Sequence, residues 1–424
     1  MPDLSKNSII YMPENSNEIN GVLQIIHGFG EHQGRYRNFA QDLAAEGYVV
    51  LTSDLKGCGN HISREGELGF FGDNAVSRLV GDIHENTKYL KKQFPEIPHF
   101  LMGFGEGALI AAVYFKKYDN FVDGLILSGM PSDPALRLLY TAIVKLAILL
   151  KGEYHRSKLL DRLINSKLYH AFSRDASRYS YLSAEQANVQ KYEEDTKCGY
   201  ILTLNGFDTY FDLMNKVYSS GSWIKKNTEC PVRFFCGEED PCLINQKHFS
   251  KTVHLFTENG YKNTAYVISP GMRHEVFFDL KKDSVFQKLL EELEEIHDSI
   301  IPKAVVVSKN KHIVLEDFID PEVDKPFIKD EKLNLEDFIN VQKEKKNLET
   351  KVEVIDFNDI KGSENISSEE MAQALNDLIN DAIGSSAAEV LPKEEEKGTS
   401  TPLDKFTGFK IDPDNIEGME DSED

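Results

Sequence analysis

Short apolar runs alternate with amphipathic segments through the first 300 residues of this 424-residue chain. Each run is rich in β-branched and aromatic residues and almost continuously apolar, which is typical of strands that are covered on both faces. We expect strands over residues 22–27, 48–53, 99–104, 124–129, 232–237 and 265–269. Strands that alternate with helices predict an α/β fold, in which helices flank a mostly parallel sheet.

The strand pattern stops from about residue 132 to about residue 228, where helical patterns take over. This interruption predicts a helical cap inserted on top of the sheet. It begins with LRLLYTAIVKLAILLKGEYHRSKLLDRL, residues 136–163, for which two interpretations are compatible. It is either a buried cap helix or a lid whose apolar face meets lipid or substrate.

Charge divides the chain into a globular part, residues 1–301, and an acidic tail, residues 302–424. The net charge is −22, and the 123-residue tail, with 15 Lys, no Arg and 31 acidic residues, contributes −16 of it. Such a segment cannot bury enough apolar surface to offset its conformational entropy, so we expect disorder. The acidic balance also argues against a general nucleic-acid binder.

The tail nevertheless carries short patterns that favour binding of a partner protein. An acidic and hydrophobic motif around Phe318 returns around Phe338, with a looser copy around Phe357. These are either docking elements or chance similarities in a biased composition. Residues 367–384 form a capped amphipathic pattern that predicts a helix without a packing surface of its own.

Five cysteines, at positions 58, 198, 230, 236 and 242, show no CxxC pair. The odd number and the spacing favour reduced thiols in a cytoplasmic protein, with no metal site and no cofactor. The N-terminus has no apolar signal-peptide core, and the apolar stretch 138–150 is too short to span a bilayer. Peripheral membrane contact through the cap stays open, because the net negative charge opposes it and the apolar cap favours it.

The sharpest local pattern is a glycine-rich turn between a strand and a helix, HFLMGFGEGALIAAVYF from His99. Gly103, Gly105 and Ala108 fit a dinucleotide-binding turn. Alternatively, the turn is a nucleophile elbow of the form GxSxG, with Gly105 where the hydroxyl belongs.

The surrounding sequence favours the elbow. A dinucleotide turn should follow the first strand, and an acid should end the next strand, whereas this turn follows the third strand. An elbow expects an early HG turn and then an acid and a histidine after later strands. His27 with Gly28, Asp240 and His274 stand in that order.

With these motifs in place, the chain resembles the α/β-hydrolases of the monoacylglycerol lipase and bacterial lysophospholipase type. Six ordered motifs carry the resemblance over residues 20–300: HGFGEHQGRY, DLKGCG, GFGEG, DTKCGY, GEEDP and GMRHE. The resemblance implies an α/β-hydrolase fold with a cap. It also implies that His274 is the base, that Asp240 is its orienting acid, and that the backbone N–H groups of Phe29 and Glu106 form the oxyanion hole.

The chain departs from that family at the elbow, where Gly105 replaces the nucleophilic serine and Phe104 replaces the preceding histidine. Acyl transfer needs a hydroxyl that the histidine can activate, and glycine has none. We therefore expect an inactive or strongly impaired hydrolase-like protein that binds an acyl-lipid or small ester ligand. The alternative is an active carboxylester hydrolase on monoacylglycerol or lysophospholipid.

Three further expectations concern individual side chains. The Glu106 side chain should diverge from the place of the missing hydroxyl, and its charge could disturb the oxyanion hole. Asp240 and His274 could persist as a buried pair that fixes two loops. Cys58 is an alternative nucleophile in motif terms, although it lies on another loop.

Overall fold

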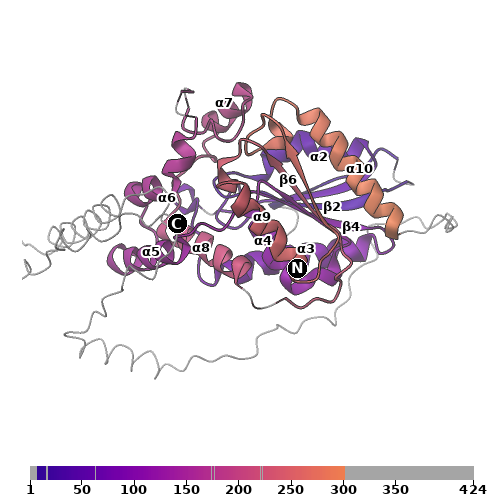
Figure 1. Ribbon diagram of the computed structural model, residues 1–424, viewed down its shortest axis with the longest axis horizontal. Helices are drawn as coiled ribbons and strands as arrows, with labels where there is room; N and C mark the ends of the chain where they lie inside the picture. Colours follow the sequence, from indigo (N-terminus) through magenta and orange to yellow (C-terminus); the bar gives the residue numbers. More distant parts are fainter. Residues whose placement is uncertain are drawn as a thin grey trace, which may run out of the picture. The chain divides into compact units, whose positions relative to one another are not determined.

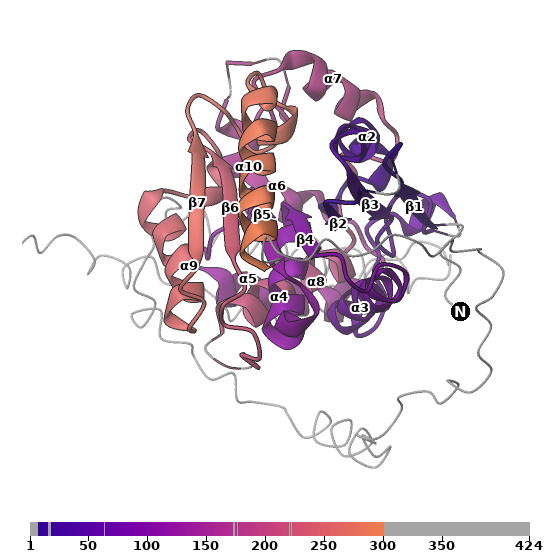
Figure 2. The same cartoon turned by 90° about the vertical axis from the view of Figure 1, so that its right-hand side faces the viewer.

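The computed structural model describes residues 7–15, 18–62, 64–172, 174–175, 177–219, 221 and 223–300. Within these residues a seven-stranded sheet has the order β1-β3-β2-β4-β5-β6-β7 (Figures 1 and 2). Its strands are β1 (Ser8–Tyr11), β2 (Gly21–Ile26), β3 (Tyr48–Ser53), β4 (His99–Phe104), β5 (Gly124–Ser128), β6 (Val232–Gly237) and β7 (Thr264–Ser269). Only the pairing of β1 with β3 is antiparallel.

Helices cover both faces of the sheet, as Figure 2 shows. On one face lie α2 (Arg37–Ala45) and α10 (Lys282–Ile300), and on the other lie α3 (Ala75–Gln93), α4 (Glu106–Tyr118) and α9 (Gln246–Glu258). The helix α10 buries Leu289, Leu293 and Ile296, whose spacing of three and four residues places them on one side of the helix. Strands β2 to β6 are buried along their whole length, which explains their continuous apolar character.

The cap consists of four helices between β5 and β6: α5 (Arg137–Lys151), α6 (Lys158–His170), α7 (Gln186–Glu194) and α8 (Leu204–Tyr218) (Figure 1). The helix α5 buries Val144 against Phe207 and Phe211 of α8. Its other side leaves Leu138 and Leu149 about 70% and 69% exposed. The helix therefore has one buried apolar side and one exposed apolar side.

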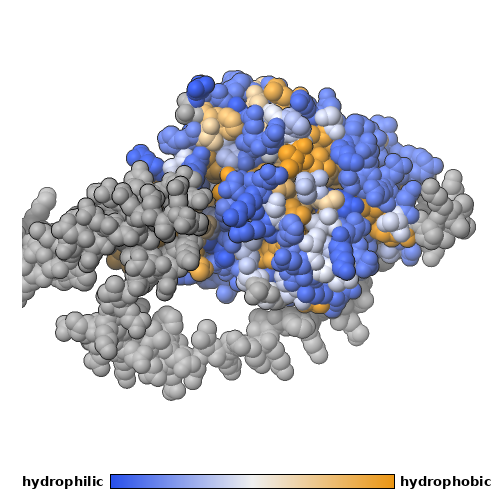
Figure 3. All heavy atoms as spheres, in the orientation of Figure 1, coloured by the Kyte–Doolittle hydropathy of each residue, from blue (hydrophilic) through white to orange (hydrophobic). Residues whose placement is uncertain are grey.

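Most of the surface drawn in Figure 3 is hydrophilic, and hydrophobic side chains gather there in separate patches. No helix within the described residues has both the length and the apolar character that crossing a membrane requires.

The predicted fold class, a mostly parallel α/β sheet of the α/β-hydrolase type, is confirmed. The edge strand β1 was not anticipated, because its four residues have no buried member and so lack the apolar run that marks the central strands. The acidic tail, its repeated motifs and the predicted helix at 367–384 lie outside the described residues.

The close approach of α4 to β2 generates a first prediction. A Cβ on Gly107 would lie 2.2 Å from the Ile26 carbonyl oxygen and 2.5 Å from that of His27. We expect Gly107→Ala to lower the free energy of unfolding by about 1–3 kcal/mol, because the helix must move off the strand. Chemical denaturation measures this loss.

Gly81 in the middle of α3 provides the matched control, because a Cβ there meets no atom within 4 Å. Gly81→Ala should raise the free energy of unfolding by about 0.5–1 kcal/mol, since alanine favours the helix. Equal effects of the two variants would contradict the packing argument.

Candidate active site

The turn between β4 and α4 has the backbone geometry of a sharp elbow. Its apex, Gly105, has φ of +53° and ψ of −119°, a region that side chains strain to adopt. A Cβ on Gly103 would lie 2.4 Å from the Gly107 carbonyl oxygen, so the turn requires glycine there as well. As a result, α4 begins directly at the carboxyl edge of the sheet, where ligands bind in α/β proteins.

Asp240 and His274 meet at this edge, because β6 and β7 are neighbours that end in register at Gly237 and Ser269. His274 Nδ1 lies 3.0 Å from Asp240 Oδ2 and 3.1 Å from Oδ1. The opposite ring nitrogen, Nε2, faces the elbow, where a Cβ on Gly105 would be 3.2 Å away. The ring therefore bridges the carboxylate and the apex of the turn.

The surroundings of His274 favour its charged form. Burial alone would lower the pKa of the imidazole, but Cys242 and Asp240 outweigh burial and raise the pKa well above 6.5. The Asp240 carboxylate therefore stabilises the imidazolium form of His274.

The Glu106 side chain occupies the place where the oxyanion hole was expected. The Phe29 N–H donates to Glu106 Oε2 over 2.9 Å, and the Glu106 amide also stabilises the charged carboxylate. Burial nevertheless raises the pKa of this carboxyl above 4.5, because the group is removed from water. The two backbone donors thus face a carboxylate that belongs to the chain itself.

An ion-pair network joins the loop that carries Phe29 to the loop that carries His274. Glu31 Oε1 accepts hydrogen bonds from the Gly28 N–H at 2.6 Å and from the Tyr36 hydroxyl at 2.8 Å. Arg35 pairs with Glu31 and donates two hydrogen bonds to Glu275, at 2.7 and 2.8 Å. Since Glu275 follows His274 directly, this network fixes both loops at once.

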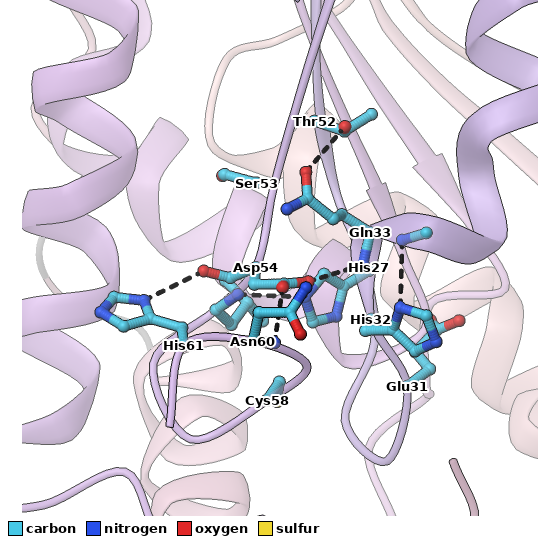
Figure 4. A network of polar contacts seen from close by, with 12 residues as sticks. His27, Glu31, His32, Gln33, Thr52, Ser53, Asp54, Cys58, Asn60 and His61 are labelled. Atoms are coloured by element: carbon cyan, nitrogen blue, oxygen red, sulfur yellow. Dashed lines mark hydrogen bonds and ion pairs between the residues drawn. The ribbon is translucent and has the colours of Figure 1, made fainter. Parts of the chain in front are cut away.

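A second network lies beneath the same loop, around the fully buried Asp54 (Figure 4). Its carboxylate accepts hydrogen bonds from the Gln33 N–H at 2.9 Å and from the Asn60 N–H at 2.7 Å. His27 accepts a hydrogen bond at Nε2 from the Leu55 N–H, and burial lowers the pKa of this ring. A neutral, fully engaged His27 supports the loop rather than taking part in proton transfer.

The cap holds both loops through hydrogen bonds. The Gly30 carbonyl accepts hydrogen bonds from the Tyr192 hydroxyl at 2.8 Å and from the Gly199 N–H at 3.0 Å. The His274 N–H donates to the Tyr181 carbonyl at 3.2 Å. Through Gly199, the DTKCGY motif therefore contacts the loop at Gly30.

The structure shows the surroundings of two cysteines near the site, Cys58 and Cys242. Cys58 accepts a hydrogen bond from the Tyr200 hydroxyl at 3.3 Å, and burial raises the pKa of its thiol to about 12. The thiol beside His274 is that of Cys242, which sequence reasoning missed. The signal was its position two residues after Asp240, which places both side chains on one tight turn.

A cavity of about 950 Å³ lies apart from this site. Its lining includes residues of α2, α7 and α10 and also Arg35 and Phe278, whereas Gly105, Glu106, Asp240 and His274 do not line it. Its walls mix both signs of charge with aromatic rings, including Arg37, Asp42, Lys191, Lys282 and Phe286. The cavity therefore borders the Arg35 network but does not include the elbow.

Comparison with known proteins supports the resemblance. Residues 17–281 match the sequence profile of the family described as serine aminopeptidase, S33. A phospholipase of Bacillus subtilis, YtpA, is 25% identical over 271 residues, which is 63% of this chain and 92% of that protein. A carboxyl esterase from Bacillus coagulans shares the fold, with a TM-score of 0.59 and 21% identity over 68% of this chain and 94% of that one.

Several monoglyceride lipases match over a shorter stretch. The rat enzyme is 33% identical over 106 residues, which is 25% of this chain and 33% of that enzyme. This chain therefore spans only about a third of the length of several monoglyceride lipases that it matches.

The raised pKa of Glu106 predicts a pH-dependent stability difference. Above about pH 4.5 the unfolded chain ionises residue 106 more readily than the folded chain does, so ionisation disfavours folding. We expect Glu106→Gln to gain stability relative to the parent as the pH rises from about 4 to about 7. Denaturant unfolding at several pH values measures this trend.

Glu292 supplies a control of opposite sign. Burial opposes its ionisation, but hydrogen bonds from Arg233 and Lys288 outweigh burial and lower its carboxyl pKa. The ionised Glu292 carboxylate stabilises the folded chain above its unfolded pKa, and this effect is lost as the pH falls. The stability of Glu292→Gln relative to the parent should therefore fall as the pH rises. Parallel trends in the two variants would refute the assignment for Glu106.

Proposed function

Because the chain belongs to the serine aminopeptidase S33 family, we propose that it is a hydrolase-like protein that has lost rapid ester hydrolysis and binds an acyl-lipid or small ester ligand. The observation that carries this proposal is a pair of consecutive residues at the elbow. Gly105 provides no nucleophile, and Glu106 directs its carboxylate at the donor that acyl transfer would require.

The missing hydroxyl has the larger effect on rate. In this proposal Gly105 occupies the nucleophile position opposite His274 Nε2. Because glycine has no side-chain hydroxyl, His274 has no nucleophile to activate. Removing the serine of a hydrolase triad typically costs about 10⁶ in turnover and leaves a small residual rate from binding and the oxyanion hole.

Glu106 removes most of that residual rate. A substrate carbonyl would have to displace a buried carboxylate from the Phe29 N–H, and the developing oxyanion would then face a like charge. Loss of one oxyanion donor costs about 10²–10³ in turnover.

The ligand class rests on the relatives and on the cap. Relatives of this chain are named as monoglyceride lipases and as a phospholipase, which favours an acyl lipid. The exposed side chains of Leu138 and Leu149 on α5 offer an apolar surface to such a molecule.

Restoring the elbow tests the proposal. We expect the parent protein to be silent on a short-chain ester and on a monoacylglycerol, and Gly105→Ser to gain weak activity. Combining Gly105→Ser with Glu106→Ala should raise turnover about a further 10²-fold, because the oxyanion donor is freed. His274→Ala added to that pair should abolish the gain.

The matched control combines Gly105→Ala with Glu106→Ala. It carries the same positive-φ strain, about 1–3 kcal/mol, but no hydroxyl, so it should be as destabilised as the serine variant and remain silent. Fast ester turnover by the parent that disappears with His274→Ala would overturn the proposal. If both double variants fold and neither hydrolyses the esters, residues 105 and 106 are not the cause of the lost activity.

A further inference from the structure

Three different metal-ligand types converge beside the elbow. The carboxylate of Asp240, the thiol of Cys242 and the imidazole of His274 place one ligand atom each within 4.8 Å of the other two. We propose that these three residues form a binding site for a zinc ion. The proposal is independent of the proposed loss of ester hydrolysis, because it concerns metal binding alone.

The distances match what zinc requires. Zinc binds sulfur at about 2.3 Å and nitrogen or oxygen at about 2.0–2.2 Å, so tetrahedral ligand atoms stand about 3.3–3.8 Å apart. Asp240 Oδ2 and His274 Nδ1 lie 3.0 Å apart, and the Cys242 sulfur lies within 4.8 Å of both ligands, so shifts of up to about 1.5 Å bring the three atoms to these separations. Three protein ligands leave a fourth position for water, as in open zinc sites.

The backbone holds the three side chains in place without a metal. Asp240 caps the short helix η4 (Pro241–Leu243) by accepting the Cys242 N–H at 2.9 Å, which aligns the first two ligands on one turn. The loop of His274 is fixed by the hydrogen bond to Tyr181 and, through Glu275, by the one to Leu182 at 2.8 Å. A site that is ordered in advance loses little entropy on binding.

The local charge also favours a cation. Asp240 is fully buried, and Glu106 contributes a second buried acid close enough to act electrostatically on His274 and Cys242. The neighbouring cation, Arg273, is turned toward Asp175 and the Ser180 carbonyl. A zinc ion bound here would therefore lie next to two buried acidic side chains.

A second cluster of the same composition, His32, Asp195 and Cys198, provides a comparison. There, His32 Nδ1 accepts the Gly34 N–H at 3.1 Å, so Nε2 must carry the ring proton that faces Asp195 at 2.8 Å. Neither nitrogen offers a lone pair to a metal unless that arrangement breaks. At His274, by contrast, Nε2 faces a glycine and can carry the ring proton, so Nδ1, the nitrogen that faces Asp240, can bind a metal. Zinc therefore favours the cluster at the elbow.

The test measures zinc binding to the full-length chain by competition with a chelating dye, and cobalt substitution reports the ligand type. We expect one zinc ion per chain and, with Co²⁺, a thiolate-to-metal charge-transfer band in the near ultraviolet. Cys242→Ser should lower zinc affinity by about 100-fold or more and abolish the band, whereas Cys198→Ser should change neither. Zinc should also slow alkylation of Cys242 in the parent chain, as peptide mapping by mass spectrometry would show.

The alkylation measurement needs no variant, so it decides the question even if Cys242→Ser fails to fold. Absence of zinc binding would overturn the proposal. So would a charge-transfer band that is lost in Cys198→Ser and retained in Cys242→Ser, which would place the metal at the other cluster. Zinc binding without a thiolate band or protection of Cys242 would assign the metal to carboxylates elsewhere and would equally refute the site.

Discussion

The left-handed backbone at Gly105 is the constraint on which the arrangement of the site depends. Gly105 at the apex has φ of +53°, and Gly103 and Gly107 stand two residues before and after it. As a result, β4 passes into α4 without a connecting loop. The helix then lies against β2 so closely that Gly107 has no room for a side chain. The same turn brings the Phe29 loop, the start of α4 and His274 to one edge of the sheet.

A glycine at such an apex has a thermodynamic consequence of its own. A side chain in this backbone region costs about 1–3 kcal/mol, which an enzyme accepts in order to expose its nucleophile. Gly105 adopts the geometry without that cost, so the elbow persists in a relaxed form. Glu106 acts in the same direction, because its carboxylate satisfies the Phe29 N–H, a donor that would otherwise need a water molecule or a ligand.

The sequence predicted the fold better than the details of the site. Central parallel strands are buried on both faces, so their apolar runs stand out, and the order of strands brings Asp240 and His274 together by topology alone. The direction of the Glu106 side chain depends on one rotamer and one backbone donor 77 residues earlier, which no local pattern encodes. Cys242 was missed for a related reason, since its role depends on a loop that follows a different strand.

The buried charges explain why the acid and the imidazole can persist without a hydroxyl to serve. Asp240 is fully buried, and Arg35 and Glu275 are nearly so. Removing one member of a buried pair leaves an unpaired charge and typically costs about 3–5 kcal/mol, comparable to a large part of the stability of a domain. The Arg35–Glu275 pair joins the Phe29 loop to the His274 loop, and Asp240 holds the His274 ring. These contacts therefore hold the Phe29 and His274 loops in place, whatever chemistry the elbow performs.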